Sequence, residues 1–186
     1  MNSLKPDLPC ALIVMGVSGS GKSTIGEALA QRLGWRYEDG DSFHPPANVA
    51  KMSAGHPLTD EDRWPWLKAI AAEIDRCRQA GEHVIIACSA LKHVYREVLV
   101  QGHDDIRMVY LSGTEHLIAD RLGHRKGHFM PPGLLDSQFA TLEPPSAAER
   151  PITVSIDAPV ALIVDHILQQ LQPDQISSPL PQRTRS

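Results

Sequence analysis

Near the start of the chain stand the residues Gly16-Val17-Ser18-Gly19-Ser20-Gly21-Lys22-Ser23, followed by Thr24. They match G-x-x-x-x-G-K-[ST], the pattern of the phosphate-binding loop or P-loop. An apolar run from Ala11 to Met15 precedes them and predicts a buried parallel strand, and helical apolar spacing follows over 24–33. The alternative is a chance turn of glycine and serine, but such a turn would not bring a strand and a helix with it.

The residue types of this loop explain what it would bind. Glycines let the backbone wrap around a phosphate chain, and the N–H groups of the loop and of the following helix turn then point at the anion. In this pattern the lysine, Lys22, reaches the β- and γ-phosphates, and the hydroxyl of Ser23 ligates Mg²⁺. Residues 16–24 therefore predict ATP and Mg²⁺ as cofactors.

Composition narrows the class of protein. The chain has 186 residues, 42% of them hydrophobic and 22% charged, which is typical of one globular domain. The net charge of −4 argues against a nucleic-acid partner or an anionic membrane. Cys10, Cys77 and Cys88 form no C-x-x-C pair, and neither a membrane-length apolar run nor a signal-peptide pattern is present. We expect reduced thiols and a cytoplasmic location.

Periodicity and turn residues predict strands and helices in alternation. The expected strands are 11–15, 35–38, 84–88, 106–111 and 152–156, and the expected helices are 24–33, 46–52, 59–80, 92–100, 115–122, 134–142 and 158–171. This order predicts an α/β fold, with a five-stranded parallel sheet and helices on both faces. We expect a flexible leader at 1–9, one domain at 10–172 with a mobile lid at about 123–143, and a disordered tail at 173–186.

Ligands of such sheets lie at the carboxyl ends of the strands, so the residues that follow each strand are the candidates. Asp39 and Asp41 follow the second strand, and His44 comes soon after. An Asp-x-Asp pair can supply both a group near Mg²⁺ and an acceptor for the proton of an attacking hydroxyl. The alternative is a solvated acidic turn. His44 either contacts the substrate or caps the turn.

Basic residues follow the third and fourth strands. Ser89, Lys92 and Arg96 come after the third, and because Lys92 and Arg96 are four apart they share one helix face. They could hold a polyhydroxy acid through its carboxylate and hydroxyls, or they could form an exposed basic face. After the fourth strand, Arg121 and Arg125 lead into a segment rich in Gly, His and Pro, which suits a lid that closes over ATP.

Two histidines of that segment raise a second possibility. His124 and His128 stand at i and i+4, a spacing that suits two ligands of one metal ion. No acidic residue or cysteine lies in the segment to complete the set, so the sequence favours a lid over a zinc site.

Over roughly Leu12 to Leu171 the sequence resembles the gluconate kinase (gluconokinase) family of P-loop small-molecule kinases. The resemblance rests on the blocks GVSGSGKST (16–24), DGDSFHPPANVAKMSAGHPLTDEDRWPWL (39–67), ACSALKHVYR (87–96) and GHFMPPGLLDSQFATLEPP (127–145). It implies a P-loop NTPase fold like that of adenylate and shikimate kinases. It also implies transfer of the γ-phosphoryl group of ATP to the 6-hydroxyl of D-gluconate, giving 6-phosphogluconate.

The resemblance also implies a role for each matching residue. The family's ATP site falls on residues 16–24 with Arg121 beside the adenine, and its metal site on Ser23 and, through water, Asp39. Catalysis would fall to Lys22, to Asp41 as the acceptor of the hydroxyl proton, and to Arg125 on the phosphate. The gluconate ligands would be Asp41, His44, Arg63, Ser89, Lys92 and Arg96. A homodimer is expected from the family only.

One departure and two alternatives stay open. The third strand ends at Cys88 and Ser89, so no separate Walker B aspartate follows it, which leaves the second metal ligand unassigned. The same fold could phosphorylate another acceptor, such as shikimate, a nucleotide or another sugar acid. The chain could instead be an ATP-binding regulator that transfers nothing, although such a protein needs neither Asp41 nor the lid arginines.

Overall fold

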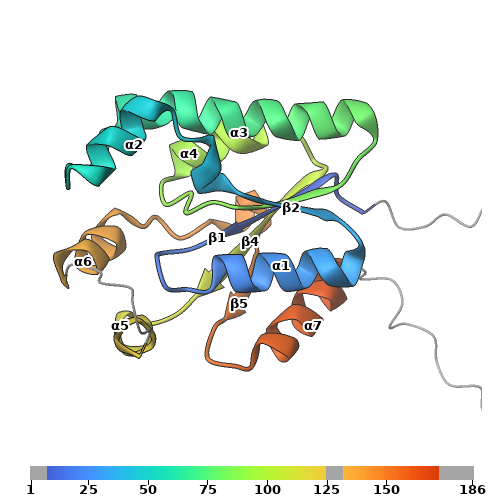
Figure 1. The fold of residues 1–186 in the computed structure, drawn as a ribbon. Coiled ribbons are helices and arrows are strands. Elements are labelled where there is room, and N and C mark those ends of the chain that lie inside the picture. Colours follow the sequence, from blue (N-terminus) through green and yellow to red (C-terminus); the bar gives the residue numbers. More distant parts are fainter. Residues whose placement is uncertain (1–7, 125–131, 172–186) are drawn as a thin grey trace, which may run out of the picture.

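The computed structural model describes residues 8–124 and 132–171. Its centre is one five-stranded sheet in the order β2-β3-β1-β4-β5 (Figure 1). All four neighbouring pairs are parallel, which confirms the predicted sheet. The strands are β1 (Ala11–Met15), β2 (Arg36–Asp39), β3 (Val84–Ala87), β4 (Ile106–Ser112) and β5 (Ile152–Ser155).

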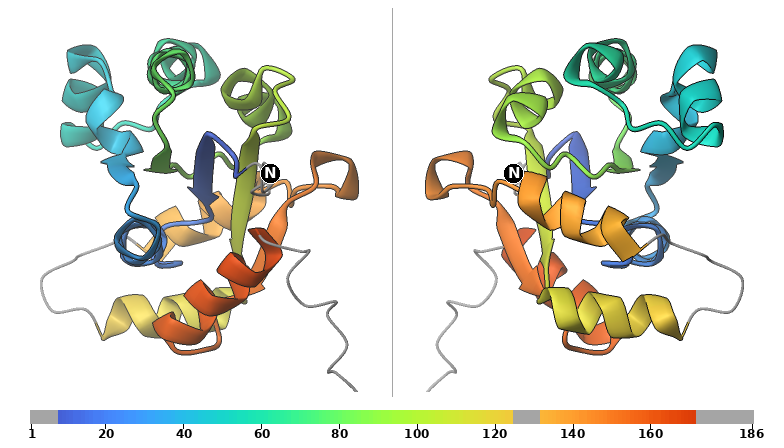
Figure 2. Two further views of the ribbon diagram at one scale, coloured as in Figure 1. Left: turned by 90° about the vertical axis from the view of Figure 1, so that its right-hand side faces the viewer. Right: turned by 90° about the vertical axis from the view of Figure 1, so that its left-hand side faces the viewer.

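Helices cover both faces of this sheet, as predicted (Figure 2). One face carries α1 (Lys22–Leu33) and α7 (Val160–Leu171), and the other carries α3 (Asp60–Ala80) and α4 (His93–Val100). Three further helices, α2 (Pro46–Ser53), α5 (Glu115–Gly123) and α6 (Pro132–Thr141), gather at the end of the sheet where the strands terminate (Figure 1). Within residues 8–124 and 132–171, every helix is too short or too polar to cross a bilayer.

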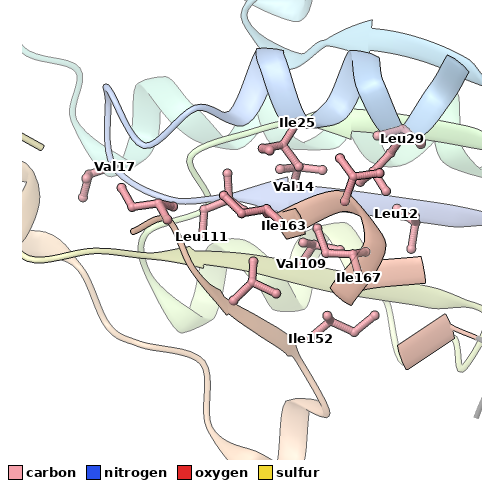
Figure 3. Close-up of a cluster of buried hydrophobic side chains, with 14 of the residues drawn as sticks. Leu12, Val14, Val17, Ile25, Leu29, Val109, Leu111, Ile152, Ile163 and Ile167 are labelled. Atoms are coloured by element: carbon pink, nitrogen blue, oxygen red, sulfur yellow. The ribbon is translucent and has the colours of Figure 1, made fainter. Parts of the chain in front are cut away.

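The core has two layers that meet at β1, whose five residues are all buried. Leu12 and Val14 point to the layer that contains Ile25 and Leu29 of α1, as Figure 3 shows. Ala11, Ile13 and Met15 point to the other layer and pack with apolar residues of α3 and α4. Burying a side chain such as leucine or isoleucine contributes about 1.5–3 kcal/mol. This burial holds β1 in the middle of the sheet and fixes where the phosphate loop begins.

Boundaries differ from the sequence-based expectation by one or two residues at most ends. Strand β2 lies at 36–39 instead of 35–38, because Asp39 pairs with Ala87 while Trp35 stacks on His83 before the strand begins. The last helix begins at Val160, so Pro159 stands just before it and not within its first turn. Helix α3 begins where predicted, since Thr59 and Asp62 form a capping box around its first turn.

Gly40 lies where the ends of β2 and β3 come closest. A Cβ atom at this position would meet the carbonyl oxygen of Ala87 well inside contact distance, and backbone cannot give way as a flexible side chain can. Gly40 directly follows Asp39 and opens the turn 40–43, so this close approach sets the position of Asp41 as well.

Gly40→Ala should therefore lower the free energy of unfolding by about 1–3 kcal/mol, the usual cost of an overpacked site. Denaturant unfolding followed by circular dichroism measures it. The matched control is Gly133→Ala in α6, where an added Cβ meets nothing within 4 Å. Equal stability of the two variants would contradict this account of the turn.

Candidate active site

The phosphate loop leaves the carboxyl end of β1, and α1 begins at Lys22. Gly21 is the N-cap of α1 with φ 95°, a left-handed conformation that favours glycine, and no side chain caps the helix. The buried Ser20 hydroxyl has no hydrogen-bond partner among the described residues. Uncapped N–H groups and an unpartnered hydroxyl at a helix N-terminus fit a bound anion.

Lys22 lies across this loop, and its Nζ donates to the carbonyl of Val17 at 3.0 Å. Burial lowers the pKa of Lys22, while the negative charges of Asp41 and Asp39 act in the opposite direction. The loop lysine and the two aspartates of the acidic turn are therefore close enough at this end of the sheet for their charges to interact. The set of an ammonium, open N–H groups and two carboxylates fits a nucleotide phosphate chain with its Mg²⁺.

A cleft of about 360 Å³ opens beside the loop, between α1, α5 and the start of α7. Gly19 and Thr24 line one side of it, and Arg121, Pro159 and Val160 line the other. The Arg121 guanidinium donates a hydrogen bond to the carbonyl of Ile156, which fixes its plane at the edge of the cleft. A planar cation and apolar walls next to a phosphate loop suit the base of a nucleotide.

The Asp39–Asp41 turn is built by its own side chains. Asp39 Oδ1 accepts a hydrogen bond from the N–H of Asp41 at 3.0 Å and so caps the short 3-10 helix 40–43. The Asp41 side chain is 85% exposed at the open side of the site. The Asp-x-Asp pair thus forms a solvated acidic turn, as in the alternative interpretation of the sequence. The same turn also places two carboxylates near Lys22.

His44 is buried behind Asp41. Its ring stacks on Trp66 with 4.2 Å between centroids, and its Nε2 lies 3.9 Å from Asp41 Oδ1. Burial lowers the pKa of His44, the Asp41 charge raises it, and the Arg63 charge lowers it. The lowered pKa favours the neutral ring, which lies just after the turn and next to the Asp41 carboxylate.

The first turns of α3 and α4 form a charged cluster next to this turn. Lys92 Nζ donates to both carboxylate oxygens of Asp60 at 3.0 and 3.1 Å, and the Tyr95 hydroxyl also donates to Asp60. Arg63 lies over the Tyr95 ring at 5.7 Å. Ser89 lies two residues past the end of β3, and its carbonyl accepts from the N–H of Gly16 at 3.4 Å. Lys92 is therefore a paired cation and not part of an exposed basic face.

Arg96 requires a correction, because the sequence suggested that it points at the substrate. Its side chain is 2% exposed, and Nε and Nη2 donate to the Glu149 carboxylate at 2.6 and 3.2 Å. Nη1 donates to the carbonyls of Ala90 and Leu91. The expected shared helix face is wrong, because Lys92 is the extended N-cap of α4 and only Arg96 lies within the helix. No local pattern marks Glu149 as the partner of Arg96. Arg96 therefore stabilises the loop after β3 from the protein interior and is not a substrate ligand.

Gln138 contacts the phosphate loop, and the sequence alone did not predict this contact. From α6 its Oε1 accepts from the N–H of Ser18 at 2.6 Å, and its Nε2 donates to the Ser18 hydroxyl at 3.0 Å. Past the end of α6, Glu143 accepts from the N–H of His93 at the start of α4. The segment from Gln138 to Glu143 thus joins the phosphate loop to the acceptor side. Gln138 lies within the family-like block 127–145, which was the only signal for it.

Two expected features fall wholly or partly outside the described residues. Arg125 lies in the segment 125–131, which is also part of the range 123–143 that was expected to form the lid. Within the described part of that range, α6 is present and contacts the phosphate loop. Arg125 stays a prediction from the resemblance.

A parallel sheet with a phosphate loop at its central strand, and an acidic turn opposite the loop lysine, defines a class: the protein is a P-loop kinase that transfers a phosphoryl group to a hydroxyl. The shikimate kinase family model matches residues 18–170. A gluconokinase of Gluconobacter oxydans is 46% identical over 88% of this chain and 92% of its own. A probable gluconokinase of mouse is 44% identical over 89% of this chain and 100% of its own.

Solved structures agree. The crystal structure of a gluconokinase from Sinorhizobium meliloti 1021 superposes with a TM-score of 0.80 at 46% identity, over 88% of this chain and 92% of that one. The chain belongs to the gluconokinase family.

Arg96→Met should lower the free energy of unfolding by about 3–5 kcal/mol, because it leaves the Glu149 carboxylate, which is only 14% exposed, without its guanidinium partner. Arg96→Met combined with Glu149→Gln should lose less, since no charge is left unpaired. Thermal unfolding compares them. A single variant that unfolds like the wild type but binds gluconate poorly would return Arg96 to the substrate site.

The same pair makes stability depend on pH. Burial alone would raise the pKa of Glu149, but its hydrogen bonds with Arg96 hold the pKa at about 2. Since this is below the unfolded value of about 4.3, the stabilisation is present above that value and is lost as pH falls towards 2. Glu149→Gln should therefore show a smaller loss of stability between about pH 5 and pH 2 than the wild type.

Gln138→Ala should weaken ATP binding about tenfold, because it removes both hydrogen bonds that hold Ser18 of the phosphate loop. Calorimetric titration of ATP in the absence of acceptor measures the change. The control is Ser137→Ala, the exposed neighbour on α6. Tighter ATP binding by Gln138→Ala would mean that the glutamine competes with phosphate instead of supporting the loop.

Proposed function

We propose that this chain transfers the γ-phosphoryl group of ATP to the 6-hydroxyl of D-gluconate, giving 6-phospho-D-gluconate and ADP. One observation carries the proposal: the loop lysine Lys22 and the Asp39–Asp41 turn lie at the carboxyl end of the sheet, within range of each other's charge. Phosphoryl transfer needs little more from a protein than positioning and charge, and this arrangement supplies both. The gluconokinases at 46% and 44% identity support gluconate as the acceptor.

The nucleotide would lie on residues 16–24, with its base in the cleft beside Arg121. Ser23 at the start of α1 and Asp39 at the end of β2 would hold Mg²⁺, Asp39 through water. When bound, the ion neutralises charge on the phosphate oxygens. Lys22 would stabilise charge on the transferring phosphoryl group, together with Arg125, whose role rests on the family resemblance.

The acceptor would lie between Asp41 and the charged cluster of α3 and α4. Asp41 is exposed to the open side of the site and would orient the 6-hydroxyl and accept its proton. The substrate carboxylate would compete with Asp60 for Lys92, whose ammonium is already placed by its two hydrogen bonds. Arg63, Ser89 and His44 complete the proposed gluconate ligands.

Location and assembly belong to the same proposal. The three cysteines are free and buried, which agrees with a reducing compartment and supports a cytoplasmic location. A homodimer remains an expectation from the family resemblance.

The direct test is formation of a phosphorylated product from ATP and gluconate, measured against a panel that includes shikimate and other sugar acids. We expect gluconate to give the highest kcat/KM. Lys22→Ala should lose most of the activity while keeping its unfolding temperature, because the ammonium acts on phosphate and, within residues 8–124 and 132–171, donates a single hydrogen bond, to Val17. Preference for another acceptor, or near wild-type turnover by Lys22→Ala, would overturn the assignment.

The two aspartates should respond differently to substitution. Asp41→Asn should lower kcat by about 10²–10⁴-fold with little change in ATP affinity, because it removes the proton acceptor and leaves the positioning intact. Asp39→Asn should instead raise the Mg²⁺ concentration needed for half-maximal activity. A Mg²⁺ titration of kcat with gluconate saturating separates the roles. A shifted Mg²⁺ midpoint in Asp41→Asn, with only a lower plateau in Asp39→Asn, would mean that the roles are reversed.

A further inference from the structure

The imidazole of His44 is held in one place by aromatic packing. Its side chain is 5% exposed and stacks nearly parallel on Trp66, with 17° between the rings. Trp66 is itself fixed, since its Nε1 donates to the carbonyl of Gly40 at 2.7 Å. The ring therefore has a fixed plane, and the two ring nitrogens face different partners.

One of those partners is Asn48 of α2, which is 3% exposed. Its Nδ2 lies 2.8 Å from the carbonyl oxygen of Asp62. A carbonyl oxygen only accepts hydrogen bonds, so this amide atom must be the NH₂ group. The same Nδ2 lies 3.3 Å from Nδ1 of His44. An NH₂ group only donates, so Nδ1 of His44 must carry the lone pair.

The other ring nitrogen then carries the proton. In a neutral imidazole a lone pair on Nδ1 means a hydrogen on Nε2, and Nε2 faces the Asp41 carboxylate at 3.9 Å. Protonating Nδ1 as well would set an N–H against the Asn48 NH₂ group. Burial and the Arg63 charge also lower the pKa of His44, against the opposing effect of Asp41. The Asp41 side chain is 85% exposed, so packing does not prevent it from closing the 3.9 Å gap and accepting from Nε2.

We propose that Asn48 is a positioning residue that fixes His44 as its Nε2–H tautomer, so that His44 presents Asp41 with a hydrogen-bond donor and no basic lone pair. One Asp41 oxygen is then held by His44, which leaves the other for the acceptor hydroxyl. Asp41 is the base of the pair, and His44 cannot take the proton at Nε2. The link to catalysis rests on the proposed function, whereas the tautomer does not.

His83 provides an internal reference with the opposite arrangement. It also stacks on a tryptophan, Trp35, at 4.5 Å and 14°. Its Nδ1, however, lies 2.9 Å from the carbonyl oxygen of Pro9, so Nδ1 must be the donor. The same molecule thus holds two stacked histidines whose tautomers are expected to differ.

Nitrogen NMR of histidine-labelled protein at neutral pH tests the tautomer directly, with His44→Phe and His83→Phe assigning the signals. We expect His44 in the Nε2–H form and His83 in the Nδ1–H form. His44 in the Nδ1–H form, or as an imidazolium ion, would overturn the proposal. The tautomer is read from the spectrum of the wild-type chain, and the two phenylalanine substitutions serve only to assign its signals.

Two variants test the positioning role. Asn48→Asp offers Nδ1 an acceptor, so it should move the proton to Nδ1 and lower kcat about 10- to 100-fold, the range expected for losing a hydrogen bond to a charged group. KM for ATP and the His83 signals should stay unchanged. Asn48→Leu removes the hydrogen-bond donor to Nδ1, so His44 should then populate both neutral tautomers.

The outcomes separate this proposal from the proposed function. A changed tautomer with unchanged kcat would overturn the positioning role. No gluconate phosphorylation by the wild type would instead overturn the proposed function, while the NMR result would still decide the tautomer.

Discussion

The burial of β1 on both of its faces is the constraint from which the site follows. Because its side chains are packed between α1 and α7 on one side and α3 and α4 on the other, the strand must lie at the centre of the sheet. Its carboxyl end then opens between β3 and β4, and the loop that leaves it turns into α1 without a side-chain cap. Packing of the apolar core thus stabilises an uncapped helix N-terminus, which can bind an anion.

Charge in the site is balanced before any ligand arrives. Lys22 faces Asp39 and Asp41, Lys92 is paired with Asp60, and Arg96 is neutralised by Glu149 inside the fold. Balanced pairs of this kind keep the cleft folded and hydrated without strong repulsion. A phosphate chain or a carboxylate then binds by exchange of partners, which costs less than creating a new buried charge.

Contacts between distant segments connect the two halves of the site. Gln138 fastens α6 to Ser18, which is 120 residues earlier, and Glu143 continues the connection to the first turn of α4. On the other side, Trp66 of α3 holds both the turn at Gly40 and the ring of His44. The nucleotide side and the acceptor side are therefore connected by a few hydrogen bonds between distant segments.

The sequence alone determined the parallel sheet with helices on both faces and the position of the phosphate loop. These features depend on local patterns, an apolar run, glycines and helical spacing, that act over a few residues. The Asp-x-Asp turn and the lysine after the third strand could be named for the same reason. Boundaries shifted by a residue or two, because pairing with a neighbouring strand sets the ends of β2.

Only the tertiary structure decided what each polar side chain does. Arg96 and Lys92 are four residues apart, yet Arg96 turns inward to Glu149, which is 53 residues away, and Lys92, the N-cap of α4, turns to Asp60. Asn48 and Gln138 carry no local signal, since an amide acquires a role only from the partners that surround it. Spacing along a helix indicates which way a side chain points. Burial and the distant residue that it pairs with decide whether a charged side chain stabilises the fold or binds a ligand.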